Sequence, residues 1–108
     1  MLLDGKIIIV TGAGTGIGHA AALLLAEAGA TVVLAGTKLD TLESTATQIK
    51  AAGGKALIIR ADVGDEHDVE ALVARTIDTF GRLDGAFNNA GVPMHGKPLD
   101  ELTSAEWG

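Results

Sequence analysis

The chain alternates between short apolar runs and longer segments in which apolar residues recur at helical spacing. Four runs have the length and apolar character of strands buried on both faces of a parallel sheet: residues 6–10, 31–36, 55–61 and 83–88. The segments between them predict three helices: residues 19–28, residues 38–52, and residues 69–80 with Asp65 as the N-cap. This regular alternation predicts an α/β fold built on a parallel sheet.

Glycines mark the ends of the predicted helices. Gly29 is a predicted C-cap for the first helix, and the pair Gly53 and Gly54 closes the second. Beyond Gly91 we expect a loop that contains both prolines of the chain, followed at residues 103–107 by a single helical turn. The regular pattern therefore stops after the fourth strand.

The order of the strands follows from the handedness of their connections. Right-handed crossovers place the four strands in the order 3-2-1-4, with two helices on one face and the third on the other. We expect one domain over residues 1–108, three layers thick, with no second domain. Ligands of such sheets bind beyond the carboxyl ends of the strands, here near the crevice between the first and fourth strands.

Composition and charge exclude several classes of function. The formal net charge is −6 and the eight basic residues are scattered, which argues against nucleic acid or an anionic membrane as a partner. The absence of cysteine excludes disulfides and cysteine-based metal sites, and we expect no metal. Since no leader-like segment precedes the first strand and no apolar run could span a bilayer, we expect a cytoplasmic protein.

A glycine-rich turn at residues 10–18 joins the first strand to the first helix. Backbone N–H groups and a partial positive charge at such a helix N-terminus suit a phosphate or pyrophosphate, and a flexible loop is the alternative. The pattern G-x-G-x-x-G fails because its last place falls on Ile17 or His19, and no Gly-Lys-Ser/Thr forms a P-loop. What fits is Thr-Gly-x-x-x-Gly-x-Gly, with Gly12, Gly16 and Gly18 as fixed members.

Two further motifs follow strands at the same predicted edge of the sheet. Asp62 and Val63 come directly after the third strand, and the tetrapeptide Asn-Asn-Ala-Gly at residues 88–91 ends the fourth. Taken alone, the first pair could hold a helix-capping or solvated aspartate, and the tetrapeptide could be an ordinary turn. Their placement around the glycine turn favours a shared ligand.

With these three motifs, the chain resembles the short-chain dehydrogenase/reductase family over essentially its whole length. Residues 81–84 and the pair Glu106 and Trp107 agree with the resemblance. It implies a Rossmann-type fold, truncated after the fourth strand, and the cofactor half of an oxidoreductase that moves a hydride between NAD(P)(H) and a carbonyl or alcohol. It also implies a cofactor-binding set: Gly12, Thr15, Gly16, Ile17, Gly18, Thr37, Lys38, Asp62, Val63, Asn89, Ala90 and Gly91.

The resemblance gives two of these motifs specific roles. In the family, the carboxylate at the position of Asp62 accepts a hydrogen bond from the adenine amine, and the backbone at Val63 reaches a ring nitrogen. The tetrapeptide at residues 88–91 holds the sheet together, and its second asparagine, Asn89, lines the cofactor ribose.

The end of the second strand bears on the choice between NAD and NADP. A carboxylate there would hold the ribose 2′-OH of NAD and repel the 2′-phosphate of NADP. Gly36 occupies that place, and no carboxylate appears before Asp40. Thr15 and Thr37 stand where NADP-preferring members place Arg or Lys, and Lys38 follows. The balance favours NADP, although Lys38 could equally be a solvated lysine at the start of the helix.

The catalytic residues of the family are missing from the chain. The family uses a Tyr whose pKa is lowered by a nearby Lys, together with a Ser, but the sequence has no Tyr, and neither Ser44 nor Ser104 follows a fifth strand. The remaining acid/base candidates are His19 and His67, which we expect at the surface, and His95 in the loop after residues 88–91. We predict no catalytic residue and no activity for the chain alone.

Two functional hypotheses remain open. The chain is the nucleotide-binding half of a short-chain oxidoreductase, truncated or completed by another chain, or it is a non-enzymatic dinucleotide-binding or interaction module. The fourth strand, residues 83–88, would expose an edge with Asp84 as its only charge. We therefore expect a homo-oligomer, or a second chain that supplies the missing half.

Overall fold

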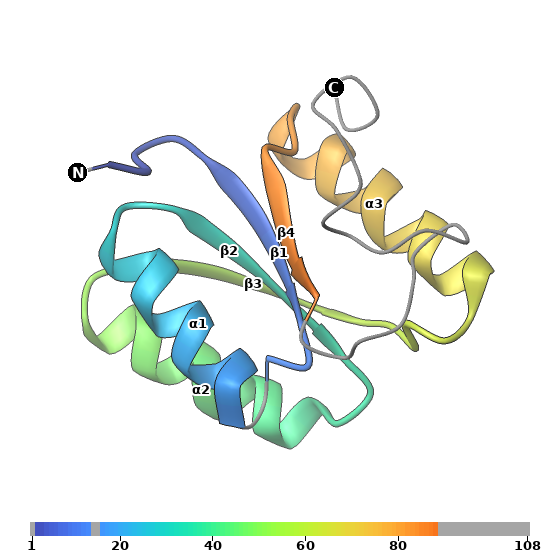
Figure 1. Ribbon diagram of the computed structural model, residues 1–108, viewed down its shortest axis with the longest axis horizontal. Helices are drawn as coiled ribbons and strands as arrows, with labels where there is room; N and C mark the ends of the chain where they lie inside the picture. The colour runs from blue at the N-terminus through green and yellow to red at the C-terminus, as the bar shows by residue number, and fades with distance from the viewer. Residues whose placement is uncertain (1, 14–15, 89–108) are drawn as a thin grey trace.

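The computed structural model describes residues 2–13 and 16–88, which form a four-stranded sheet between helices (Figure 1). In chain order the elements are β1 (Ile7–Thr11), α1 (Gly16–Glu27), β2 (Thr31–Gly36), α2 (Leu39–Ala51), β3 (Lys55–Arg60), α3 (Glu66–Phe80) and β4 (Gly85–Asn88). All seven predicted strands and helices are therefore present. The loop and the helical turn expected after residue 91 lie outside the described residues.

The sheet is parallel throughout, and its strand order is β3-β2-β1-β4. The predicted fold class and strand order are thus confirmed. β1 and β2 occupy the centre, where Ile9, Val10, Val32 and Leu34 are fully buried. Central parallel strands need this continuous apolar character because helices cover both of their faces.

Helices α1 and α2 cover one face of the sheet and α3 covers the other, as predicted (Figure 1). Neighbouring residues on one strand point to opposite faces, so Ile9 and Val10 belong to two separate apolar cores. The core on the α3 side includes Ile9, Val33, Val69 and Leu72. The core on the other side includes Val10, Leu34, Ala22, Leu42 and Ile49. The described helices include none that is long and apolar enough to cross a membrane.

Helix ends follow the predicted caps, with one boundary corrected. Asp65 caps α3, since its Oδ1 accepts from the backbone N–H of His67 at 2.8 Å. Gly29 and Gly53 follow α1 and α2 with left-handed φ values of 104° and 87°. The prediction that α1 begins at residue 19 is wrong: the helix begins at Gly16. Gly18 is buried in the first turn, and this burial outweighs the low helix propensity of glycine.

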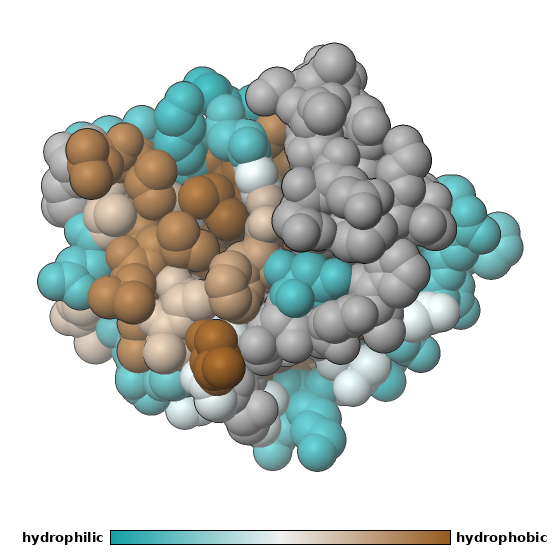
Figure 2. All heavy atoms as spheres, viewed as in Figure 1, coloured by the Kyte–Doolittle hydropathy of each residue, from teal (hydrophilic) through white to brown (hydrophobic). Residues whose placement is uncertain are grey.

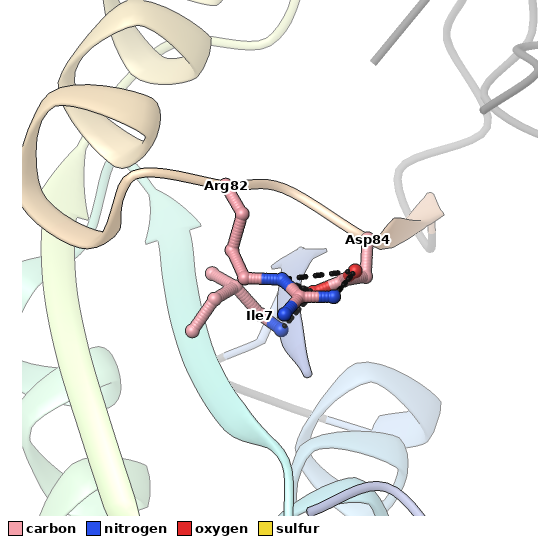
Figure 3. Close-up of polar contacts among 3 residues, drawn as sticks. All are labelled: Ile7, Arg82 and Asp84. Atoms are coloured by element: carbon pink, nitrogen blue, oxygen red, sulfur yellow. Dashed lines mark hydrogen bonds and ion pairs between the residues drawn. The ribbon is translucent and has the colours of Figure 1, made fainter. Parts of the chain in front are cut away.

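Arg82 and Asp84, which directly precede β4, clamp the start of β1 (Figure 3). The Ile7 N–H donates to Asp84 Oδ2 at 2.8 Å, and the Asp84 N–H donates to the Ile7 carbonyl at 2.9 Å. Arg82 donates to the same carboxylate, from Nε to Oδ2 at 2.9 Å and from Nη2 to Oδ1 at 2.6 Å. The guanidinium lowers the pKa of Asp84. Because a carboxylate replaces a strand carbonyl here, β4 begins at Gly85 and not at residue 83, which corrects the predicted boundary.

Candidate functional site

A cavity of about 340 Å3 opens at the carboxyl ends of β1, β2 and β3. It is lined by Gly12, Ala13, Gly36, Thr37, Lys38, Thr41, Leu42, Ala61, Asp62 and Val63. Three segments that are distant in sequence meet here because parallel strands end at one edge of the sheet. Five residues of the predicted cofactor-binding set share the cavity: Gly12, Thr37, Lys38, Asp62 and Val63.

The rest of the predicted set lies at the start of α1 or outside the described residues. Gly16 and Ile17 are exposed in the first turn of α1, and Gly18 is buried there. Thr15 and residues 89–91 are not among the described residues, so the β4 side of the predicted crevice is known only up to Asn88. The Thr11 hydroxyl donates to Asn88 Oδ1 at 3.0 Å and so ties the carboxyl end of β1 to β4.

The backbone of the glycine turn takes conformations that favour glycine. Gly12 and Gly16 have φ values of 64° and 59°, in the left-handed region where a Cβ atom is strained. A Cβ placed on Gly16 would meet no heavy atom within 4 Å, so the space beside this backbone is open. An open space against glycine backbone at a helix N-terminus suits a phosphate or pyrophosphate.

Asp62 faces the cavity in a position fixed by two hydrogen bonds. Its Oδ1 accepts from the Gly64 N–H at 2.9 Å, and its own N–H donates to Asp68 Oδ2 at 2.8 Å. Asp65 is the N-cap of α3, so Asp62 is not a helix-capping aspartate. Within residues 2–13 and 16–88, Asp62 Oδ2 accepts no hydrogen bond, which leaves it available to a ligand amine. Asp68 was not foreseen, because nothing in the sequence shows that its carboxylate turns back towards β3.

Arg60 is a second residue that sequence reasoning missed. It is the cross-strand partner of Gly36, and its Nε donates to the Thr37 carbonyl at 3.3 Å. A guanidinium therefore lies beside the end of β2, close to the exposed Thr37 and Lys38. Its position could have been predicted from the alignment of the two parallel strands, since a register that starts at Thr31 and Lys55 places Arg60 opposite Gly36.

Ala13 is held from the α2 side by Thr45, which is fully buried. The Thr45 hydroxyl donates to the Ala13 carbonyl at 3.0 Å, and His19 Nδ1 lies 2.7 Å from the same hydroxyl oxygen. A single row of polar contacts thus joins α1 and α2 to the Ala13 carbonyl in the glycine turn. His19 and Thr45 lie far apart in the sequence, on different helices, so no local pattern pairs them.

The family model for the short chain dehydrogenases matches residues 6–108. The chain belongs to the short-chain dehydrogenase family. Family members bind NAD or NADP, and the chain corresponds to the amino-terminal part of its homologues. It is 50% identical over 101 residues to a 2,5-dichloro-2,5-cyclohexadiene-1,4-diol dehydrogenase of Sphingobium indicum, and this match covers 94% of the chain but 39% of that relative.

Solved short-chain dehydrogenase structures include relatives with either cofactor. A metagenomic short-chain oxidoreductase in complex with NADP is 37% identical, with a TM-score of 0.82, over 98% of this chain and 48% of that one. A short-chain dehydrogenase/reductase of Burkholderia phymatum in complex with NAD is 34% identical, with a TM-score of 0.74, over 80% of this chain and 31% of that one. The chain thus spans less than half the length of these relatives.

The three histidines of this short-chain dehydrogenase chain have different surroundings. His67 is exposed in the first turn of α3, as expected. His19 is half-buried and contacts Thr45, so the expectation that it lies at the surface is wrong. Its imidazole is partly buried because Nδ1 contacts the hydroxyl of the buried Thr45. His95 lies outside the described residues, and among those described no group of three or more His, Asp or Glu side chains could hold a metal ion.

Proposed function

We propose that residues 1–108 all belong to one partial NAD(P)-binding domain that serves as the cofactor-binding part of a short-chain oxidoreductase. The observation that carries the proposal is the convergence of Gly12, Asp62 and Val63 on one cavity at the carboxyl edge of the sheet. The reaction of the whole protein would transfer a hydride between NAD(P)(H) and a carbonyl or alcohol substrate.

Each part of the predicted set then has a task. The glycine turn, with Gly12, Thr15, Gly16, Ile17 and Gly18, would hold the pyrophosphate through backbone N–H groups. The free carboxylate oxygen of Asp62 would accept from the adenine amine, and the Val63 backbone would meet the adenine ring. Near the ribose rings the proposed residues are Thr37, Lys38, Asn89, Ala90 and Gly91.

We propose NADP as the preferred cofactor. Gly36 leaves no carboxylate at the end of β2 to repel a 2′-phosphate, and two cationic side chains, Lys38 and Arg60, flank that place. Arg60 strengthens this proposal because its guanidinium reaches the Thr37 carbonyl. Guanidinium groups bind phosphate oxygens through several donors at once.

The bound cofactor would supply or take up the hydride. The described residues would bind it and fix its adenine and pyrophosphate, but the chain has no Tyr to move the hydroxyl proton of a substrate. In a complete oxidoreductase that proton donor has to come from other residues. The lack of Tyr in these 108 residues also fits the second candidate, a non-enzymatic dinucleotide-binding or interaction module. Neither candidate predicts turnover by these residues alone, so turnover by the product of the whole reading frame separates the two.

We also propose that the chain associates through β4 and α1, as a homo-oligomer or with a chain that supplies the missing half. Among the described strands β4 pairs only with β1, and its Phe87 is 37% exposed. Apolar side chains gather over α1 (Figure 2), where Ile17 and Leu24 are 70% and 66% exposed. An unpaired strand edge beside apolar surface is a template for association. Sedimentation at micromolar concentration tests this, and a stable monomer would contradict it.

Titration of the 108-residue chain with NADPH and NADH, by calorimetry or fluorescence, tests the cofactor proposal. Gly16→Ala places a methyl group in the open space of the turn and is expected to raise the Kd about tenfold. Gly53→Ala is the matched control, because Gly53 also has a left-handed φ and open space but lies at the opposite edge of the sheet. It should bind like the parent chain.

Two results would overturn the proposal. One is the absence of binding by either dinucleotide at millimolar concentration. The other is a Gly16→Ala chain that binds as tightly as the parent.

The cytoplasmic location also remains a prediction from the sequence, and the position of a tagged chain in cells tests it.

A further inference from the structure

Three polar groups connect α1 and α2 to the glycine turn. His19 on α1, the hydroxyl of Thr45 on α2 and the carbonyl of Ala13 form a row with separations of 2.7 and 3.0 Å. Thr45 is fully buried, and so is Ala13. Beside this row, Ala22 of α1 and Ala46 of α2 belong to the same buried apolar core.

The single hydroxyl proton decides the direction of these hydrogen bonds. Carbonyl oxygens only accept, so the Thr45 hydroxyl is the donor in its contacts with the Ala13 carbonyl and, at 3.2 Å, with the Thr41 carbonyl of its own helix. When the hydroxyl donates to the buried Ala13 carbonyl, the contact with His19 requires a proton on Nδ1. Hydrogen bonds to Ala13 and His19 at the same time therefore require a ring with a proton on Nδ1, because in the Nε2–H tautomer the hydroxyl would donate to Nδ1 instead.

Apolar packing alone does not require this chain of groups. A valine at position 45 has nearly the shape of threonine and would fill the same space in the core. The hydroxyl instead gives the buried Ala13 carbonyl a partner at the point where β1 has ended and the turn begins. Because a peptide unit is planar, a hydrogen bond to the Ala13 carbonyl oxygen also fixes the orientation of the whole peptide plane.

We propose that His19 and Thr45 are positioning residues for the dinucleotide: they hold the Ala13 peptide, at the start of the glycine turn, in its binding orientation before the cofactor arrives. A backbone group that is already held in place loses less conformational entropy when a ligand binds, which raises affinity without a direct contact. The inference rests on the proposed function, since it needs a dinucleotide in the turn. Neither side chain has to touch the cofactor.

Thr45→Val and Thr45→Ser test the role of the hydroxyl in the 108-residue chain. Thr45→Val keeps the shape and removes the donor, so we expect the Kd for NADPH to rise about tenfold. Thr45→Ser keeps the donor and should stay within about twofold of the parent. Thr76→Val is the matched control, because Thr76 is equally buried and donates to a carbonyl of its own helix, Leu72, in α3. It should lower the unfolding midpoint and leave the Kd unchanged.

A second pair of variants tests His19 without changing the core. The side-chain amide of His19→Asn can place an N–H near the position of Nδ1 and should rescue affinity, whereas His19→Leu should weaken binding as Thr45→Val does. NMR of the ring nitrogens, at a pH where the imidazole is neutral, should report the Nδ1–H tautomer for His19. An Nε2–H tautomer would overturn the contact chain.

The outcomes separate this inference from the proposed function. If the parent chain binds neither NADPH nor NADH, the proposed function fails and the positioning role falls with it, whatever the tautomer. If the parent binds and Thr45→Val binds equally well, or if Thr45→Val and Thr76→Val weaken binding equally, only the inference is overturned. Should Thr45→Val not fold, the comparison of His19→Asn with His19→Leu decides.

Discussion

The two ends of β1 are both tied to β4, but by different chemistry. At the amino end, the charged pair Arg82 and Asp84 grips Ile7 through both of its backbone groups. At the carboxyl end, the neutral Thr11 hydroxyl contacts Asn88, and the next residues open onto the cavity. At the amino end the polar groups bond to one another, whereas at the carboxyl edge of the sheet the Asp62 carboxylate lines the cavity with one oxygen, Oδ1, bonded to the Gly64 N–H. The first arrangement stabilises the sheet and the second can bind a ligand.

The largest expected effect is on catalysis, because the carboxyl end is expected to bind a cofactor but not to catalyse a reaction. The purified chain should bind NADPH but show no dehydrogenase turnover with a panel of alcohols and ketones. Without a Tyr, the loss of acid/base catalysis alone amounts to a factor of about 10²–10⁴. Absorbance at the reduced nicotinamide band measures it, and turnover that persists through stringent purification would contradict the prediction.

The next effect separates stability from binding at the amino end. Asp84→Ala removes the acceptor of the Ile7 N–H and should lower the free energy of unfolding by about 1–3 kcal/mol, with the Kd for NADPH unchanged. Asp84→Asn is the control, because its amide oxygen can still accept from Ile7 and so should cost less. Urea unfolding measures both variants. A weakened cofactor affinity in Asp84→Ala would show that the two ends of β1 are not independent.

A smaller effect is expected at the β2 side of the cavity. Arg60→Gln should raise the Kd for NADPH about fivefold and change that for NADH little, because only NADPH carries a 2′-phosphate for the guanidinium. Lys55→Gln removes a charge from the other end of the same strand and should change neither constant. Equal effects of Arg60→Gln on both dinucleotides would exclude a role in cofactor choice.

The smallest effect is the pH dependence of the clamp. Arg82 lowers the pKa of folded Asp84 from its ordinary value of 3.8. The stabilisation from this carboxylate is therefore complete above about pH 4 and is lost as the pH falls through the folded-state pKa. The stability difference between the parent chain and Asp84→Asn should shrink below that pH. A difference that stays constant down to pH 2 in urea unfolding would contradict the shift.

Sequence patterns predicted the architecture because each strand is short and apolar and each helix has its own cap or stop. The order of the strands followed from handedness alone. That ligand groups meet at the carboxyl edge followed from the fact that parallel strands end together, but the cavity lies at β1, β2 and β3, whereas the predicted crevice between β1 and β4 is described only as far as Asn88. The boundary of α1 was misjudged because burial of Gly18 outweighs its propensity. The predicted start of β4 was wrong because the Ile7 N–H bonds to the Asp84 side chain and not to a backbone carbonyl. The sequence pattern alone does not distinguish Asp84 from a strand residue.

The supporting residues of the candidate site could not be found in the same way. Asp68, His19 and Thr45 act through contacts between separate elements, and nothing in their local sequence shows where their side chains point. Arg60 lies between these two cases: its local sequence does not show its role, but its place opposite Gly36 follows from the strand register. Of the predicted cofactor-binding set, the residues that the structure describes line the cavity or lie in the first turn of α1, whereas the positions of the residues that support them depend on tertiary packing.

The clamp at Ile7 also has a consequence for how the chain assembles. β1 meets β2 after one crossover helix, at Ile7 and Thr31, but it meets Asp84 only across a separation of 77 residues. Closing the longer loop costs about 1 kcal/mol more in chain entropy than closing the shorter one. On a ribosome, the first two strands can pair long before Asp84 has been synthesised. β4 is then the last of the four described strands to join, and the pair Arg82 and Asp84 fixes it to β1.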